Sequence, residues 1–213
     1  MGRPPAERRH NEVHGEQQHL ARLSVAPGSR EACYDWQMET YQCSYFRSWN
    51  QNHIPLSRYL LPYSQFLTAV TRFNHRHMIN QCLMYRYVVS YEPYNFKGRL
   101  DDIPLTLEYG KKMDALRRDL RDWFWDGEFR DTVGALVTAG GEIHHPYSVF
   151  LHAKTRQKAV VVSNYDNADN VTVEITTDDG QAFDRWRLVD DPTWRPASDI
   201  VIPPRSAAVV LPE

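Results

Sequence analysis

Six short segments rich in Val, Ile, Thr and aromatic residues limit the fold of this chain more than any other feature. They are Val133–Thr138, Tyr147–Ala153, Lys158–Ser163, Val171–Thr176, Phe183–Val189 and Ser206–Leu211. Turn-forming clusters such as Gly140-Gly141 and Asp178-Asp179-Gly180 separate them. Short strands joined by such turns are typical of small antiparallel sandwiches and barrels. We therefore predict a β-sandwich over residues 132–213.

The preceding residues, 31–131, are dense in aromatic side chains and mostly follow a helical period. The clearest predicted helix runs from Pro104 to Trp125, and one of its faces carries Tyr109, Met113, Leu116, Leu120 and Trp123. Acidic residues before it and Gly127 after it favour a helix start and a helix end. We expect Trp123, Phe124 and Trp125 to seal this helix against the core.

Two further helices are predicted, at Gln65–Phe73 and at Ile79–Tyr87, while Trp36–Arg47 fits a helix and a strand equally. The first 30 residues differ from both parts, because they hold no aromatic residue and eight charged ones. We interpret residues 1–30 as a disordered or non-native arm. The predicted organisation is thus an arm, a mostly helical part over 31–131 and a β-sandwich over 132–213.

Charge and composition argue against several classes of partner. The net charge is −2, and acidic residues outnumber basic ones in 132–213, so neither nucleic acid nor an anionic membrane is an expected partner. No apolar run approaches the roughly 20 residues of a membrane-spanning helix. The basic N-terminal residues are not followed by the apolar stretch of a secretory signal, so we expect a soluble chain and assign no compartment.

Metal and cofactor sites are not expected either. Cys33, Cys43 and Cys82 lack the CxxC spacing of zinc sites and are interpreted as buried free thiols, although a Cys33–Cys43 bridge stays open in an oxidising compartment. The pairs His75/His77 and His144/His145 have no third ligand at the usual spacing. The chain also lacks a glycine-rich phosphate loop and a GxSxG elbow, and no cofactor is predicted.

Several phrases of the sequence resemble a known class of enzyme. SYEPYNFKG at 90–98, RLDDIPLTLEYG at 99–110 and EFRDTVGA at 128–135, together with upstream REACYDWQMETYQCSYFR and SRYLLP, resemble the closing part of a glycoside-hydrolase-like (β/α)₈ barrel. VVVSNYDNADNVTVEI and IVIPPRSAAVVLP resemble the all-β domain that often follows such barrels. The resemblance covers residues 31–213 and is strongest over 79–135.

The resemblance implies an α/β plus all-β fold, with an incomplete TIM-barrel segment before the β-sandwich. A complete barrel takes roughly 250 residues, so 31–131 would supply about its last three βα units. It further implies a C-terminal fragment of a carbohydrate-active hydrolase that is inactive by itself and that forms oligomers or aggregates through its open barrel edge. The alternative is a non-catalytic carbohydrate-binding or structural β-sandwich module.

Candidate site residues follow from the needs of glycoside hydrolysis. Two carboxyl groups must flank the scissile bond, and barrel sites gather at the C-terminal ends of the strands. Glu31 and Asp35, beside aromatic neighbours, are the predicted catalytic carboxylates; each also fits an ordinary loop or helix-cap residue. Aromatic rings with a few polar groups suit a sugar. The predicted substrate-binding residues are Trp36, Arg58, Tyr91, Glu92, Tyr94 and Asn95.

One short motif stands apart from this reading. Asn170-Val171-Thr172 matches the N-x-[ST] acceptor triplet of N-glycosylation. Without evidence that the chain is secreted, we interpret this three-residue match as a coincidence.

Overall fold

The computed structural model describes residues 67–70, 76–91 and 98–213. The helical elements are α4 (His77–Met84), the short 3₁₀ turn η1 (Leu100–Asp102), α5 (Pro104–Asp119) and α6 (Arg121–Phe124). The strands are β1 (Leu67–Val70), β2 (Val88–Tyr91), β3 (Glu128–Phe129), β4 (Ala135–Ala139), β5 (Glu142–Ile143), β6 (Tyr147–Leu151), β7 (Lys158–Ser163), β8 (Val171–Thr177), β9 (Arg185–Leu188), β10 (Arg195–Pro196), β11 (Ile200–Ile202) and β12 (Ala207–Leu211).

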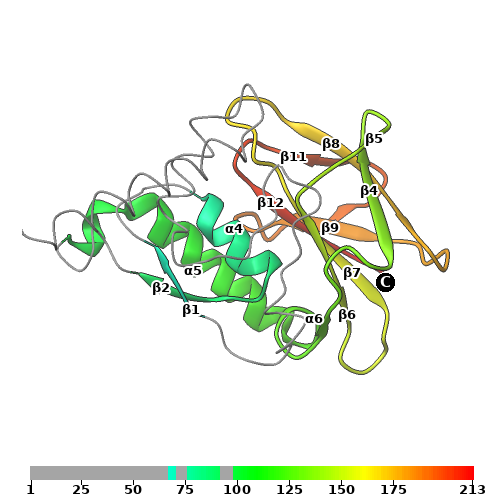
Figure 1. The fold of residues 1–213 in the computed structure, drawn as a ribbon, viewed down its shortest axis with the longest axis horizontal. Helices are drawn as coiled ribbons and strands as arrows, with labels where there is room; N and C mark the ends of the chain where they lie inside the picture. Colours follow the sequence, from blue (N-terminus) through cyan, green and yellow to red (C-terminus); the bar gives the residue numbers. More distant parts are fainter. Residues whose placement is uncertain (1–66, 71–75, 92–97) are drawn as a thin grey trace, which may run out of the picture.

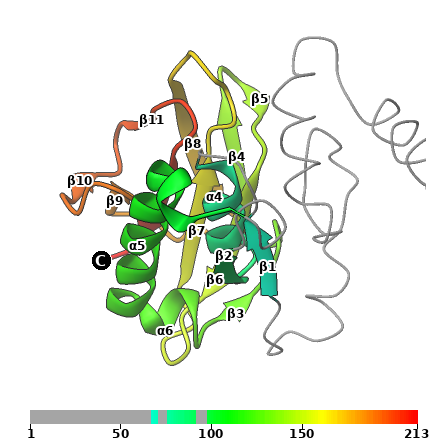
Figure 2. The same cartoon turned by 90° about the vertical axis from the view of Figure 1, so that its left-hand side faces the viewer.

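Two antiparallel sheets form the larger part of the described molecule. The six-stranded sheet has the order β10-β9-β12-β7-β6-β3, and the four-stranded sheet has the order β11-β8-β4-β5. The helices lie on one side of these sheets (Figure 1 and Figure 2). The predicted all-β component is therefore confirmed, and each of the six predicted strands overlaps an observed strand: β4, β6, β7, β8, β9 and β12.

Strand β7 separates two hydrophobic clusters, because its side chains point alternately to opposite faces of the six-stranded sheet. Val160 and Val162 belong to the cluster between the two sheets. Ala159 and Val161 belong to the cluster that also contains side chains of α4, α5 and α6. All six residues of β7 are buried. The helical layer and the sandwich therefore share one sheet, and this cluster crosses the predicted boundary at 131/132.

The long predicted helix is confirmed, with a break. Pro104 begins α5, and its buried face includes Tyr109, Met113 and Leu116. The backbone leaves helical geometry at Leu120 and starts again as α6. The break lets Phe124 bury its ring against Phe150 of β6, with the ring centroids 5.3 Å apart and nearly perpendicular. Phe124 is buried in the cluster and Trp123 packs against it, as expected, whereas Trp125 is half-buried and lies beside Arg117.

The prediction fails at the first described strand. Residues 67–70, placed within a predicted helix at Gln65–Phe73, form β1, which pairs in parallel with β2. A parallel pair needs a crossover connection, and α4, close to the predicted helix at Ile79–Tyr87, lies within that connection. A four-residue apolar segment does not distinguish a strand from a helix by period alone. Two parallel strands do not amount to a partial TIM barrel, and the described residues give that prediction no support.

Polar contacts fix the helices on the sheet. The Tyr109 hydroxyl donates to Asn80 Oδ1 at 2.8 Å and accepts from the Ala207 amide of β12 at 3.2 Å. Arg76 lies over the Tyr109 ring and forms an ion pair with Asp190 at 3.0 Å. These contacts join residues far apart in the sequence, so they define how the two layers pack.

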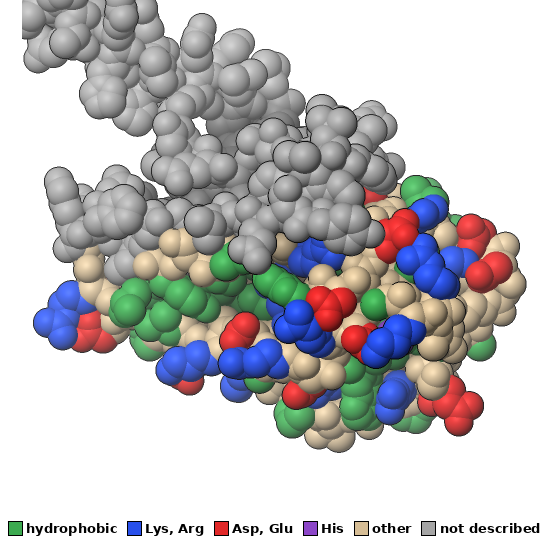
Figure 3. All heavy atoms as spheres, turned by 90° about the horizontal axis from the view of Figure 1, so that it is seen from below, with side chains coloured by type: hydrophobic (Ala, Val, Ile, Leu, Met, Phe, Trp, Pro, Cys, Tyr) green, Lys and Arg blue, Asp and Glu red, His purple; other side chains and the backbone are tan. Residues whose placement is uncertain are grey.

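Among the described residues, the face drawn in Figure 3 shows no large area of a single charge sign. Basic and acidic side chains are interspersed there (Figure 3), and α5 pairs Lys111 with Glu108 and Arg118 with Asp114. Exposed pairs of this kind contribute little to stability. Within the described part of the chain, none of the helices has the length and apolarity needed to cross a membrane.

Replacing Phe124 tests the shared cluster. Phe124→Ala should lower the free energy of unfolding by about 3–5 kcal/mol, because it removes a fully buried ring from the contact between α6 and β6. Leu136→Ala, on an exposed side chain of β4, should change it by about 0.5 kcal/mol or less. Denaturant titration measures both values, and equal losses would contradict the assignment of Phe124 to the core.

Candidate functional site

The structure describes one of the predicted site residues, Tyr91. The predicted catalytic carboxylates, Glu31 and Asp35, lie outside the described residues. So do the other predicted substrate-binding residues: Trp36, Arg58, Glu92, Tyr94 and Asn95. Their roles stay predictions.

Tyr91 is the last residue of β2, at the carboxyl end of the parallel pair. The register pairs Leu67 with Val88 and Val70 with Tyr91, so both strands end at the same level. In sheets of parallel strands, ligands bind outside the carboxyl ends of the strands. This end of the β1–β2 pair is therefore the candidate site.

The Tyr91 side chain lies against α5. A Cβ atom at Gly110 would lie only 1.9 Å from Tyr91 Oη, so the bare glycine backbone is what lets the phenol approach the helix. Tyr91 and Val89 pack against the helical cluster, as expected for residues two apart on a strand. The ring is half-buried and serves the contact between β2 and α5.

The surroundings of Tyr91 keep its phenol protonated. Burial, reinforced by the Cys82 thiol and the Asp114 carboxylate and opposed by Arg117, raises the pKa of Tyr91 to about 12. At neutral pH its hydroxyl is a hydrogen-bonding group and not a base. Burial likewise lowers the pKa of Arg117 to about 10, and its guanidinium donates to the Tyr87 carbonyl at 2.6 Å.

The sequence interpretation did not predict strand β2, so it did not place Val88 and Ser90 on the face of β2 opposite Tyr91. Val88 and Ser90 alternate with Val89 and Tyr91, so they leave the strand on the side away from α5. Residues 90–98 read as a loop because aromatic and polar residues mix there with Pro93. The preceding Val88-Val89 is the signal that a strand extends into this segment.

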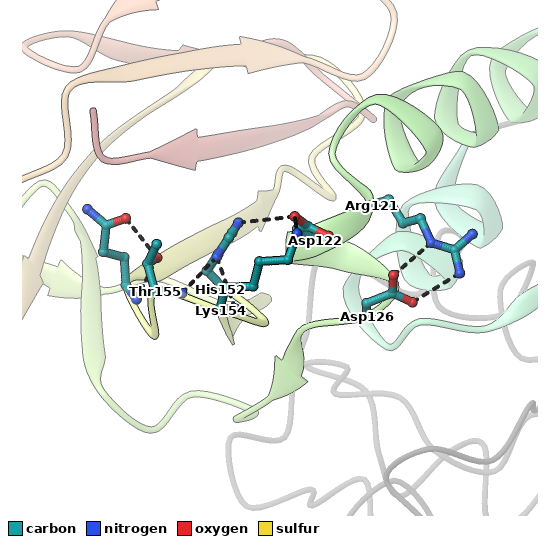
Figure 4. Close-up of polar contacts among 7 residues, drawn as sticks. Arg121, Asp122, Asp126, His152, Lys154 and Thr155 are labelled. Atoms are coloured by element: carbon teal, nitrogen blue, oxygen red, sulfur yellow. Dashed lines mark hydrogen bonds and ion pairs between the residues drawn. The ribbon is translucent and has the colours of Figure 1, made fainter.

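A second polar cluster joins α6 to the hairpin between β6 and β7 (Figure 4). Asp122 accepts from Lys154 Nζ at 3.0 Å and lies 3.8 Å from His152 Nε2. His152 Nδ1 accepts from the backbone amides of Lys154 and Thr155, at 3.2 and 3.1 Å. Because Nδ1 accepts, the neutral ring carries its proton on Nε2, toward Asp122.

This cluster is suited to holding the hairpin in place. The Ala153 amide also donates to the Asp122 carbonyl at 2.9 Å, and the Lys154 ammonium lowers the pKa of the Asp122 carboxyl. Nucleophilic catalysis needs a hydroxyl or thiol hydrogen-bonded to the base. The nearby Thr155 hydroxyl instead donates to Gln157 at 2.9 Å, and Arg121 pairs with Asp126 at 2.7 Å. The arrangement lacks the geometry of a catalytic pair.

The described histidines and cysteine have structural contacts. His77 packs edge-on against Tyr165, and His145 stacks on Tyr147. The ring of His144 lies 2.9 Å from the Ser163 carbonyl, and burial lowers the pKa of His144. Cys82 is buried, as predicted. No group of three or more metal-ligating side chains occurs within residues 76–91 and 98–213.

Comparison of the chain with protein-family models, with curated proteins and with solved structures gives no match.

Size complementarity between Gly110 and Tyr91 can be measured directly. Gly110→Ala should destabilise the chain by about 1–3 kcal/mol, because the added methyl group collides with the phenol oxygen. In a Tyr91→Phe background that oxygen is absent, and the cost should fall by at least about 1 kcal/mol. Denaturant titration of the four chains of this cycle gives the coupling, and equal costs in both backgrounds would refute the contact.

The high pKa of Tyr91 predicts a change in alkaline stability. The phenol ionises at its ordinary pKa of 10.0 in the unfolded chain and at about 12 in the folded one, so folding loses stability as the pH rises through this window. Tyr91→Phe should lose less stability than the wild type between these pH values. Below about pH 9 the two pH slopes should coincide. Thermal unfolding across the pH series measures both, and identical alkaline slopes would rule out this pKa.

Proposed function

We propose that the chain is the C-terminal portion of a glycoside-hydrolase-like, carbohydrate-active protein and that it has no hydrolytic activity by itself. In this proposal residues 31–131 contribute closing βα units to a (β/α)₈ barrel. The antiparallel sheets are the β-sandwich domain that follows it.

The sequence resemblance over residues 31–213 carries the proposal, and the order β1–α4–β2–α5 is compatible with it. Two parallel strands with a helix between them, followed by a second helix, make the unit that (β/α)₈ barrels repeat. Two such strands are compatible with several parallel sheets, so the barrel rests on the sequence resemblance. The sandwich directly after these helices matches the domain order that the resemblance implies.

The chemistry assigned to the chain follows from the two-carboxylate mechanism. Either Glu31 or Asp35 is proposed as one carboxylate of the pair, acting as an acid, base or orienting group near the scissile bond. Tyr94 and Asn95, together with Glu92, are proposed to contact the sugar just beyond the end of β2. Hydrolysis needs two carboxyl groups about 5–5.5 Å apart for retention or about 6.5–9.5 Å apart for inversion. A chain that supplies only part of the barrel does not complete that pair, which is why we expect no turnover.

The sandwich by itself is a poor candidate for a sugar-binding module. The register of the four-stranded sheet puts Leu136, Thr138, Ile143, Thr172, Glu174, Thr176 and Val201 on its outer face. None of these side chains is aromatic, whereas a flat sugar-binding surface needs exposed rings.

The most accessible tryptophan of the sandwich is also occupied. Arg185 and Arg187 lie 4.7 and 5.0 Å from the centroid of the Trp194 ring. A ring already stacked on guanidinium groups is not free to stack on a sugar. Within the alternative interpretation, this favours a structural module over a carbohydrate-binding one.

Affinity electrophoresis in gels that contain soluble polysaccharides tests the proposal. The wild-type chain should be retarded by at least one of xylan, mixed-linkage glucan, galactomannan and starch, and a reducing-sugar assay should detect no hydrolysis. Tyr94→Ala should abolish the retardation by removing a stacking ring. Leu136→Ala, an exposed change on β4 outside the predicted site, is the control and should retain it.

Each result has a definite reading. If no polysaccharide retards the wild type, the carbohydrate part of the proposal is wrong. If retardation survives Tyr94→Ala, the sugar binds elsewhere on the chain. Reducing sugar released by the purified wild type would show that the chain is an active hydrolase by itself.

A further inference from the structure

The sequence contains one N-x-[ST] triplet, Asn170-Val171-Thr172, and its two polar residues lie on the surface. Asn170 ends the connection between β7 and β8, at one end of the two sheets (Figure 1). Both Asn170 and Thr172 are exposed. N-glycans are carried on surface segments of this kind.

The two polar side chains of the triplet, Asn170 and Thr172, are exposed, whereas Val171 packs against the cluster between the sheets. The connection is held by its other residues: Asn164 Nδ2 donates to the carbonyls of Asp169 and Ile202, at 2.8 and 3.0 Å. Asp166 Oδ1 accepts from the amides of Ala168 and Asp169, at 2.7 and 2.8 Å. Neither Asn170 nor Thr172 makes a side-chain hydrogen bond to the described residues.

The two neighbouring asparagines, Asn164 and Asn167, both use their side chains in the fold. Asn164 is buried and donates twice, and Asn167 accepts from Arg205 Nε at 2.8 Å. Both amides therefore have structural partners, and neither belongs to an acceptor triplet. Asn170 alone of the three combines an uncommitted amide with a hydroxyl two residues later.

We propose that Asn170 is the residue that accepts an N-linked glycan when the chain is translocated into the secretory pathway. The donor is an oligosaccharide carried on a lipid pyrophosphate. Asn170 Nδ2 forms a bond to C1 of the first sugar, and the bond from C1 to the pyrophosphate oxygen breaks. The lipid pyrophosphate leaves with that electron pair, and Nδ2 gives up one proton to the transferase. The proposal is independent of any carbohydrate-binding function of the chain.

Translation of the full chain behind a cleavable leader, in the presence of microsomal membranes, tests the proposal without requiring that every variant fold stably. The protease-protected wild-type product should gain the mass of one core oligosaccharide, and peptide-N-glycosidase F should remove it. Asn170→Gln and Thr172→Val should lack the added mass, whereas Thr172→Ser should retain it.

Asn167→Gln is the matched control and should be glycosylated like the wild type. A protease-protected wild-type product without the added mass would overturn the assignment. A glycan that persists in Asn170→Gln would overturn it as well, because the modified residue would then lie outside the triplet.

Discussion

The hydroxyl of Tyr109 determines how the helical layer sits on the six-stranded sheet. It donates to Asn80 of α4 and accepts from the backbone of β12, so one buried oxygen joins three elements. The apolar contacts around it supply most of the attraction, but they are not directional. A buried hydroxyl without its partners costs free energy, and this penalty selects one packing of the helices among several of similar area. Burial, with Asp190 nearby, also raises the pKa of Tyr109 far above its ordinary range, which keeps the donor proton in place.

The strands with the clearest sequence signal were those with long apolar or alternating runs, such as Lys158–Ser163, whose predicted bounds match β7. Two-residue strands such as β3 and β10 carry no period of their own, and their pairing partners alone define them. The helix prediction for residues 67–70 was wrong for a different reason. Parallel strands lack the polar alternation of half-exposed ones, so their apolar residues also fit a helix face. The break at Leu120 was not predictable because the hydrophobic period continues through it into α6.

The sequence predicted where the candidate site lies along the chain but not how its side chains are oriented. The mixture of aromatic and polar residues over 90–98 pointed to Tyr91, and the parallel register puts this residue at the carboxyl end of β2. The direction of its ring depended on Gly110, which is 19 positions away and carries no side chain for a pattern to detect. The buried arginines gave no signal either. Arg117 follows the hydrophobic face of α5 in the sequence and reads as an ordinary surface charge until the Tyr87 carbonyl is brought to it.

Strand β7 contributes side chains to both hydrophobic clusters, and this constrains how the sequence can change during evolution. Ala159 and Val161 pack in the cluster with the helices, and Val160 and Val162 pack in the cluster between the two sheets. A substitution that changes side-chain volume in one cluster shifts β7 and therefore alters the packing in the other cluster. The helical part and the four-stranded sheet never need to touch in order to constrain one another. Substitutions in these two distant stretches of the gene should accumulate in compensating pairs, with β7 itself the slowest segment to diverge.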